Sequence, residues 1–364
     1  MNEVIRKRAK NIVYNKVKSS YKEEDCTLLI EDISDIVTEI TIEEKERLIN
    51  VGVSYSETLT KEYLPTSEYL KIFFDEVENK KTVIAEYIAY LSKHILKNRG
   101  QDVILVSLAR GGTPIGILIK RYIKFKYNIN IKHYSISVIR GRGLDYNALT
   151  YIINENNNDN ILFVDGWTGK GSITSEIEKS IKIYNETYKT NIKDELAVVL
   201  DPANVSRFYG SREDLLLPNA LLNATVSGLI SRTVDKYCGE YKFHGAKYYE
   251  EYKDNDLSNF FIDSVSKEFC KMKPYKNIKL EGKTDKAYET LNYIIDKYKV
   301  SDINKIKLSI GEASRVLLRR KAKLIILNSV NSNEVRHIKL LAKEKGVALI
   351  EDENIKYTAI AIIE

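Results

Sequence analysis

The sequence predicts an α/β protein of two units: a parallel sheet with helices on both faces, then a small α/β/α sandwich. Two observations support this fold class. Between residues 102 and 201, apolar runs of strand length alternate with segments of helical periodicity, which is typical of a parallel sheet. After residue 283 the same alternation resumes on a smaller scale. The polar stretch 272–283, which contains Pro274 and Gly282, marks the boundary between the units.

The composition is that of an ordinary globular protein. Of the 364 residues, 43% are hydrophobic and 30% are charged, and a chain of this length holds two or three domains. No apolar run reaches the roughly 18 residues of a membrane span, and the N-terminal residues lack the apolar core of a signal peptide. We therefore expect a cytoplasmic protein with no membrane partner. The net charge of +6 weakly favours an acidic partner.

The elements are expected in the following order. Residues 1–57 show short helical patterns and predict a helical extension on a principal domain at 58–275. Segment 67–97 has the periodicity of one or two helices. Strands of the principal sheet are expected at 102–108, 131–138, 161–165 and 195–201, with helices at 113–125 and from 172, and a less regular cap over 219–270. The C-terminal domain, 284–364, is expected to have helices at 284–298, 311–320 and 333–345 and strands at 305–308, 323–327, 347–351 and 357–363.

The first glycine-rich turn, LARGGTPIG, follows the first strand of the principal sheet. Gly111 and Gly112 allow close approach of a ligand to the backbone, and Arg110 offers a forked donor to a phosphate. Thr113-Pro114 suits a helix start. The turn therefore predicts either an anion site or a plain connection between strand and helix.

The second glycine-rich turn, ILFVDGWTGKGS, joins a buried strand to the helix that begins near Ser172. Such a turn presents backbone N–H groups at a helix N-terminus, where an anion is favoured. The spacing excludes a nucleotide-binding P-loop, because Gly166 lies three residues before Gly169 and Lys170 is followed by Gly171. A phosphate beside Asp165 is the predicted ligand.

Together the two turns resemble those of the type I phosphoribosyltransferases. By that resemblance Asp165 would hold the ribose hydroxyls of phosphoribosyl pyrophosphate, and Arg140 and Arg142 in IRGRGLDY would stabilise the departing pyrophosphate. The sugar would bind together with Mg²⁺. The residues implied to contact its phosphates are Arg110, Gly111, Gly112, Thr168, Gly169, Lys170, Gly171 and Ser172.

The pattern departs from that family at one position. Gly166 stands where a second acid is expected, so a non-catalytic sensor for a nucleotide or phosphoribosyl ligand is the alternative to a transferase. Trp167 would either stack on a base or cover the loop as part of the core. His244, in FHGAKYYEEY, would pack beside Phe243 or line the pocket near the ribose.

The C-terminal segment IKLSIGEASRVLLRRKAKLIIL resembles the RNA-binding fold of the ribosomal L7Ae proteins and of Pelota. A bacterial family that joins a phosphoribosyltransferase domain to a Pelota-type domain is similar along nearly the whole chain. It is associated with tellurium-resistance gene clusters and is also classed as StiP-type cysteine proteases. RNA is the expected partner, with a solvated helix face or a protein contact as alternatives; the candidate contacts are Glu312, Arg315, Arg319, Arg320 and Lys321.

A cysteine protease is the third functional hypothesis. It requires a thiolate with a nearby base, and the candidates are Cys26, Cys238 and Cys270, of which Cys238 lies six residues before His244. The thiols show no metal-type spacing, so no metal bound by protein ligands alone is expected. The leading prediction is a phosphoribosyltransferase with an RNA-binding domain, possible as a homodimer.

Overall fold

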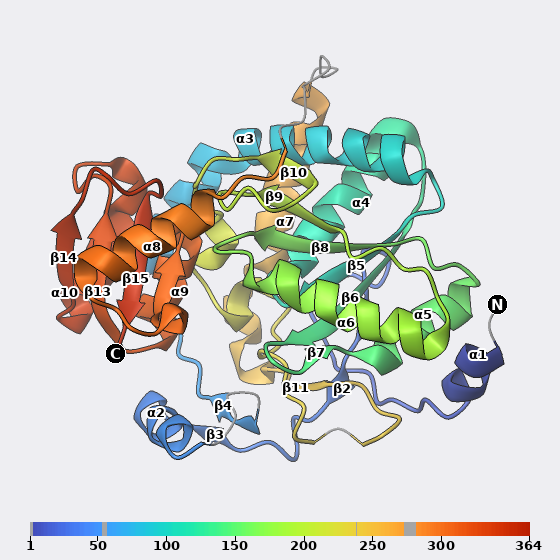
Figure 1. Ribbon diagram of the computed structural model, residues 1–364. Coiled ribbons are helices and arrows are strands. Elements are labelled where there is room, and N and C mark those ends of the chain that lie inside the picture. Colours follow the sequence, from blue (N-terminus) through green and yellow to red (C-terminus); the bar gives the residue numbers. More distant parts are fainter. Residues whose placement is uncertain (1–2, 53–56, 238, 273–281) are drawn as a thin grey trace.

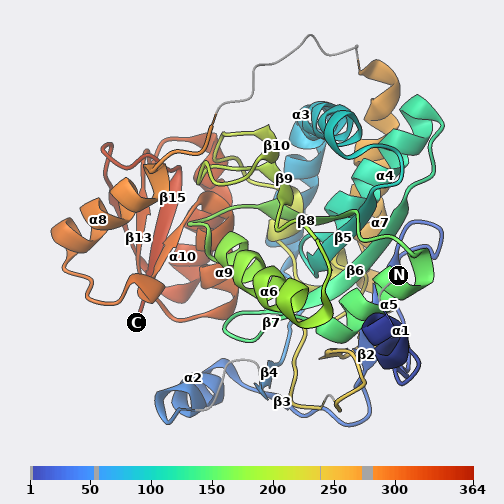
Figure 2. The same ribbon diagram turned by 45° about the vertical axis from the view of Figure 1, so that its right-hand side comes forward.

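A computed structural model describes residues 3–52, 57–237, 239–272 and 282–364 (Figure 1). The described residues form a large parallel sheet with helices on both faces and a separate C-terminal sheet (Figures 1 and 2). The predicted fold class is therefore confirmed. None of the described helices is long and apolar enough to cross a membrane.

The principal sheet has its strands in the order β1-β6-β5-β8-β9-β10, each parallel to its neighbours. Their bounds are β1 Thr27–Leu29, β6 Lys132–Ile139, β5 Ile104–Ala109, β8 Ile161–Trp167, β9 Leu196–Leu200 and β10 Phe208–Ser211. A short strand, β7 (Gly143–Leu144), runs antiparallel to the end of β6. The glycine-rich turns follow the adjacent strands β5 and β8, so they lie at one edge of the sheet, where ligands of such sheets bind.

Side chains of the strands point alternately into two cores. Leu105 and Val164 belong to the core beneath α3, α4 and α7, whereas Val106 and Phe163 belong to the core beneath α5 and α6. This period of two is the geometry of a strand buried on both faces. The helices are α3 Ser67–Arg99, α4 Thr113–Tyr127, α7 Ser258–Ser266, α5 Tyr146–Asn156 and α6 Ser172–Tyr188. The segment 67–97 thus forms a single helix.

The N-terminal 57 residues differ from the expected helical extension. They contain α1 (Glu3–Ala9) and α2 (Ile42–Asn50), but β1 pairs with β6 and is an edge strand of the principal sheet. Two further short strands of this segment pair with later residues: β2 (Glu31–Asp32) pairs with β11 (Gly245–Ala246), and β3 (Glu39–Ile40) pairs with β4 (Leu59–Thr60). The strands are too short to show a periodicity of their own in the sequence.

The C-terminal domain is the predicted α/β/α sandwich. Its sheet has the order β12-β15-β13-β14, with β13 and β14 parallel and β15 antiparallel to both its neighbours. Helix α8 packs on one face, and α9 and α10 on the other. The bounds are α8 Lys286–Tyr298, β12 Ile306–Leu308, α9 Ile310–Arg319, β13 Ala322–Leu327, α10 Arg336–Lys345, β14 Ala348–Glu351 and β15 Ala359–Ile363.

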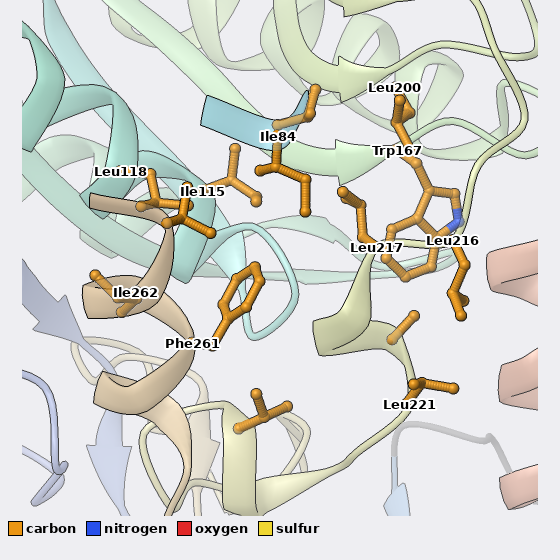
Figure 3. Packing of buried hydrophobic residues seen from close by; sticks show 14 of the residues in the cluster. Ile84, Ile115, Leu118, Trp167, Leu200, Leu216, Leu217, Leu221, Phe261 and Ile262 are labelled. Atoms are coloured by element: carbon orange, nitrogen blue, oxygen red, sulfur yellow. The ribbon is translucent and has the colours of Figure 1, made fainter. Parts of the chain in front are cut away.

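The two domains share one apolar core. Ala313 and Leu317 of α9 belong to the same cluster as Trp167, Leu217 and Leu221 of the principal domain. Figure 3 shows Trp167 beside Leu216 and Leu217, on the side of this core that faces the C-terminal domain. Burial of this kind stabilises a domain interface by roughly 25 cal/mol for each Å² of apolar surface removed from water. The C-terminal domain is therefore firmly docked rather than tethered.

Polar contacts fix the orientation of this docking. Asp214 accepts hydrogen bonds from the backbone N–H of Ile310, at 3.1 Å, and of Thr358, at 2.8 Å. Lys80 of α3 forms ion pairs with Glu76 of its own helix and Glu334 of the C-terminal domain. Asp214 thus caps the start of α9 from the other domain.

Candidate functional site

The first glycine turn is shaped for close packing. A Cβ atom at Gly112 would lie 2.3 Å from the carbonyl oxygen of Val164 and 3.0 Å from that of Leu108, so only glycine allows α4 to start here. Arg110 is 7% exposed and its guanidinium donates to the carbonyl oxygen of Ile230 at 2.7 Å and to Glu62 at 2.5 Å. Arg110 is therefore held by the protein itself, away from the second turn.

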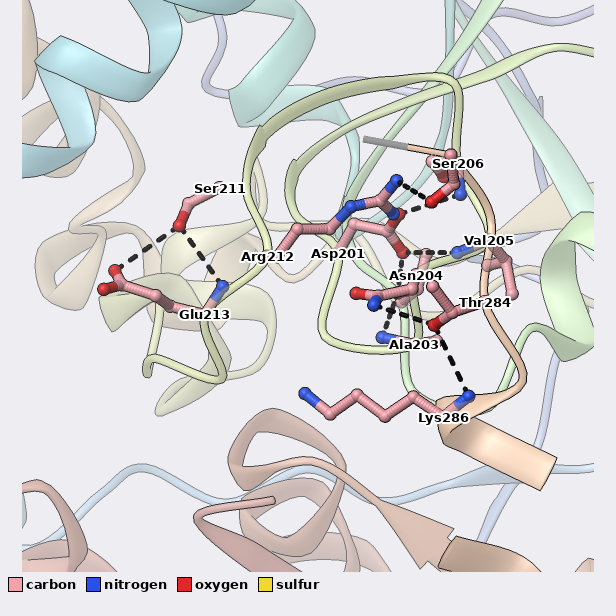
Figure 4. Close-up of polar contacts among 12 residues, drawn as sticks. Asp201, Ala203, Asn204, Val205, Ser206, Ser211, Arg212, Glu213, Thr284 and Lys286 are labelled. Atoms are coloured by element: carbon pink, nitrogen blue, oxygen red, sulfur yellow. Dashed lines mark hydrogen bonds and ion pairs between the residues drawn. The ribbon is translucent and has the colours of Figure 1, made fainter. Parts of the chain in front are cut away.

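The threonine of the second turn is held in the same way. The Thr168 hydroxyl donates to Asp201 at 2.5 Å and accepts from the backbone N–H of Ala203 at 3.2 Å. Asp201 also receives Arg212 and the backbone N–H groups of Val205 and Ser206 (Figure 4). This network fixes the turn after β8, but it leaves the Thr168 hydroxyl committed to protein partners rather than to a phosphate.

Lys170 and the following glycine form the other part of this turn. The Lys170 ammonium donates to the carbonyl oxygens of Ile303, at 2.6 Å, and Ile306, at 3.3 Å. Burial, together with nearby Lys307 and Arg140, lowers its pKa to about 8. Gly171 has a φ of 85° and precedes α6 at Ser172. The turn places Lys170 and a helix N-terminus beside one space, and phosphate binding there stays a prediction.

That space is a cavity of about 210 Å³ whose walls come from both domains. The principal domain contributes Arg140, Asp165 and residues 167–174, and the C-terminal domain contributes Lys307, Leu308, Glu312 and Arg315. The Tyr357 hydroxyl donates to the carbonyl oxygen of Gly169 at 3.0 Å. Helix α9 and its flanking strands therefore cover the second glycine turn, which the sequence did not indicate.

Asp165 lies at the base of this cavity. It accepts a hydrogen bond from the backbone N–H of Gly166 at 2.8 Å. Desolvation raises the pKa of its carboxyl group to about 6, and the Arg315 guanidinium only partly offsets that rise. Near neutral pH a fraction of Asp165 is protonated, so this carboxyl group can either donate or accept a hydrogen bond.

Trp167 serves as core and as a contact for α9, which is the second of its two predicted roles. Its side chain is 9% exposed, and the Arg315 guanidinium lies 4.1 Å from the centre of its ring. A Cβ atom at Gly311 would come within 2.5 Å of the ring. The ring therefore has no face open to a base in this arrangement.

The remaining predicted residues of the principal domain are spread around the cavity. Arg140 lines it and donates to Asn304 at 2.5 Å. Arg142 lies 3.4 Å from Asp235 and is half-exposed. His244 contacts Ser137 through Nδ1 at 2.9 Å and does not line this cavity. Only Arg140 of these three lies where a phosphate-bearing ligand could reach it.

The predicted RNA-binding residues face different surroundings. Glu312 and Arg315 line the cavity, and Arg319 donates to Asn223 of the principal domain at 2.6 Å. Lys321 is exposed and pairs with Glu364 at 2.5 Å, and Arg320 lies beside it. One side of the basic helix is therefore used for domain docking, and only its C-terminal end reaches the surface.

A cysteine–histidine pair lies elsewhere, in the core next to the edge strand β1. Cys26 Sγ is 3.9 Å from His133 Nε2, and Ser107 Oγ is 2.7 Å from the same nitrogen. His133 Nδ1 is 2.9 Å from the carbonyl oxygen of Asp25, which can only accept, so Nδ1 bears the proton and Nε2 is the basic nitrogen. No local sequence pattern indicates this pair, because 107 residues separate its members.

Burial suppresses the charged forms of both groups. Cys26 is 2% exposed and His133 is 3% exposed. Desolvation raises the pKa of the Cys26 thiol well above its usual range and lowers the pKa of His133 to about 4. The pair is thus neutral in this state, and the basic nitrogen accepts a hydrogen bond from the Ser107 hydroxyl at 2.7 Å while the Cys26 thiol lies 3.9 Å away.

The other cysteines offer no such pair in the described structure. Cys270 is exposed, and its thiol donates to the carbonyl oxygen of Lys267 at 3.4 Å. Cys238 lies outside the described residues, so its predicted relation to His244 has no structural account. Among the residues that are described, no three His, Cys, Asp or Glu side chains are placed to hold a metal ion. The carboxylates of the turn cavity are Asp165 and Glu312, and Mg²⁺ there stays a prediction that depends on a phosphate-bearing ligand.

These features define a protein with a parallel α/β domain, a buried thiol–imidazole pair and a docked RNA-binding-type sandwich. The family described as "Tellurite-like stress resistance cysteine protease StiP" matches residues 19–266, and the Pelota RNA-binding domain matches residues 285–364. The chain belongs to the StiP family. It is 31% identical over 363 residues to the "Cysteine protease StiP" of Acinetobacter baylyi, covering 95% of this chain and 94% of the relative.

A solved hypoxanthine-guanine phosphoribosyltransferase, from Schistosoma mansoni in complex with IMP, aligns over 52% of this chain and 84% of its own. The identity is 12% and the TM-score is 0.25, values that support no functional argument. The prediction of a phosphoribosyltransferase is therefore wrong, since the family and the relative are both described as cysteine proteases. The predicted kinship, the link to tellurium resistance and the Pelota-type RNA-binding domain are confirmed.

Proposed function

We propose that this chain is a cysteine peptidase of a stress-response system, with Cys26 as nucleophile and His133 as general base. The single observation that supports these roles is the 3.9 Å approach of Cys26 Sγ to His133 Nε2, the nitrogen left basic by the hydrogen bond at Nδ1. A base held by a third group is the arrangement that activates a thiol. The family description supports the reaction class.

The reaction requires a state in which substrate reaches the thiol. In the described state Cys26 is 2% exposed. Asp25, the residue before it, lines a cavity of about 300 Å³ together with Lys120, Arg121 and Phe125 of α4. Movement of α4 away from the Asp25–Cys26 segment would keep the Asp25 carbonyl on His133 and restore water to the pair. Hydration brings the two pKa values together and favours thiolate formation. The described state is then the latent form.

Cysteine variants test this assignment. Hydrolysis of unfolded casein would be measured for the wild-type protein and for Cys26→Ser, Cys238→Ser and Cys270→Ser. We expect Cys26→Ser to lower the rate by more than about 100-fold, because the loss of a nucleophile removes the covalent path, and Cys270→Ser to have no effect. Full activity of Cys26→Ser would exclude this nucleophile, and loss of activity in Cys238→Ser alone would place it there.

A second candidate function is a non-catalytic sensor of a phosphate-bearing ligand such as a nucleotide. It is favoured by the neutral, sealed state of the Cys26–His133 pair and by Lys170 and Arg140 at the cavity beside the second glycine turn. Wild-type protein without peptidase activity that binds a nucleotide, and loses this binding in Lys170→Ala, would support the sensor. Absence of binding would exclude it.

We place RNA contact at the exposed C-terminal end of α9, on Arg320 and Lys321. Arg319 contacts Asn223, so it is occupied by docking, whereas Lys321 is exposed. Reversal of both charges, Arg320→Glu with Lys321→Glu, should lower RNA retention most at low salt and reduce the slope of log K against log salt by about 2. Lys343→Glu, on exposed α10 surface, is the matched control. Equal retention by the double variant and the control would move the RNA surface elsewhere.

We also propose a cytoplasmic location and a homodimer. Sedimentation of the purified chain, with a mass of 41.9 kDa per copy, would give the oligomeric state directly.

A further inference from the structure

A second cavity, larger than that of the glycine turn, lies at the other end of α9. Its volume is about 370 Å³, within the range of small-molecule sites. Segments distant in sequence enclose it. The principal domain contributes Ile42, Lys45, residues 59–66, Tyr69, Arg110, residues 221–225, Arg232 and Tyr252, and the C-terminal domain contributes Leu318, Arg319, Leu341, Glu344 and Lys345. It shares no lining residue with the cavity beside Lys170.

The charged residues of the cavity wall are predominantly cationic. The lining cations outnumber the lining carboxylates, Glu62 and Glu344; they are Lys45, Lys61, Arg110, Arg232, Arg319 and Lys345. Glu62 is already neutralised by Arg110 at 2.5 Å. Arg110 is 7% exposed, and its Nε has no hydrogen-bond partner in the described structure. Its other two guanidinium nitrogens are paired. Arg110 is therefore enclosed, and the exposed cations Lys61 and Lys345 are the ones that an anion in the cavity would meet.

The cavity is also aromatic and apolar on one side. Tyr63, Tyr69 and Tyr252 line it, together with Leu64, Pro65, Leu221 and Leu222. Tyr63 is 66% exposed and Leu64 is 44% exposed, which is unusual for large apolar side chains at the mouth of a cavity. A flat, hydrophobic ligand group would cover these residues, and cations beside aromatic rings are suited to a ring that bears phosphates.

We propose that this cavity binds a nucleotide-like organic anion, meaning an aromatic ring joined to phosphate. The ring would lie against the tyrosines, and the phosphates would face Lys61 and Lys345. The site is independent of the assignment of Cys26, which lies in the core beside β1 and is absent from the cavity wall.

Occupation of this site would also hold the C-terminal domain in place. Arg319 and Lys345 belong to that domain, whereas Lys61 and Arg110 belong to the principal one. A ligand that contacts both binds only the docked arrangement and stabilises it according to its concentration and affinity. Binding of the small molecule would thus reduce the fraction of molecules in which the docked face of α9 is exposed.

Calorimetric titration with ADP tests the site. Lys61→Glu and Lys345→Glu are exposed positions whose change should leave the fold intact. Because single exposed charges contribute modestly, we expect each substitution to weaken ADP binding by about two- to fivefold, and the two together by more. Lys343→Glu, on the same helix but outside the cavity, should bind as the wild type does. ADP should also raise the melting temperature of the full chain.

Adenosine and inorganic pyrophosphate separate the two parts of the ligand. Both should bind more weakly than ADP, because each lacks one of the recognised groups. No binding of ADP, or equal binding of adenosine, would overturn the proposal, as would ADP binding that is lost in Lys170→Ala but unchanged in the double variant Lys61→Glu/Lys345→Glu. That last result would assign the nucleotide to the glycine-turn cavity instead.

Discussion

The Cys26–His133 pair and the second glycine turn are both potentially reactive, but their surroundings differ. The pair lies within the core, where both groups are neutral. The turn lies at the strand ends, and charged residues of a second domain cover it. The first region needs a change of state before it can react, whereas the second needs only a ligand that fits. Substitutions in each region should therefore change different properties of the protein.

The largest loss of stability is expected at Trp167, which lies between the glycine-turn cavity and the apolar core. Trp167→Ala removes a side chain that is 9% exposed and packs beneath Arg315. It should lower the free energy of unfolding by about 3–5 kcal/mol, measured by urea denaturation. Trp167→Phe, which keeps an aromatic ring, should lose much less. A small loss for Trp167→Ala would mean that α9 is not held by this contact.

Gly116→Ala tests how tightly the buried pair is sealed. A Cβ atom there would lie 2.2 Å from both His133 Nε2 and Ser107 Oγ. We expect a loss of about 3 kcal/mol, because overpacking forces the imidazole out of position. Gly282→Ala, where a Cβ atom meets nothing within 4 Å, is the control. If Gly116→Ala is as stable as the control, the Cys26–His133 pair is already mobile. The two regions would then not differ in how rigidly their reactive groups are held.

Asp165→Asn tests how protonation of the Asp165 carboxyl, in the glycine-turn cavity, changes the stability of the protein with pH. The folded pKa of Asp165 is raised to about 6 from 3.8, so the folded state binds the extra proton and stability falls as pH rises from about 4 to 6. That shift corresponds to up to about 3 kcal/mol, and partial access of solvent reduces it to about 2. The variant should therefore lose less stability than the wild type between these pH values. Asp296→Asn, exposed on α8, should keep the wild-type profile.

The smallest effect is expected for Arg315→Ala. Its guanidinium lies 4.1 Å from the Trp167 ring centre and pairs with Glu312 at 3.3 Å. A partly solvated contact of this kind contributes about 0.5–1 kcal/mol. Lys323→Ala, at an exposed position of β13, should be neutral by the same denaturation measurement. Equal free energies of unfolding for the two variants would show that apolar contacts alone hold α9 over the second glycine turn.

The sequence predicted the two glycine turns and the basic helix correctly as local elements. It could not show that Arg110 pairs with Glu62, that the Thr168 hydroxyl is taken by Asp201, or that Arg315 lies over Trp167. Each partner is distant in sequence, and nothing in the local pattern selects it. Several of the residues inferred by resemblance therefore have protein partners in the structure, and Arg110, Arg142 and His244 do not line the glycine-turn cavity.

The sequence by itself determined the four central strands β5, β6, β8 and β9, helices α4 and α6, both domain types and the position of the turns, because periodicity and glycine spacing are local properties. The tertiary structure decided what those elements face. Docking of α9 over Trp167 covers the glycine turn at the strand ends and encloses the cavity beside Lys170. It also leaves a separate, larger cavity between the domains. Pairing of β1 with β6 brought Cys26 to His133. Both arrangements depend on apolar packing between segments about a hundred or more residues apart, which no local signal encodes.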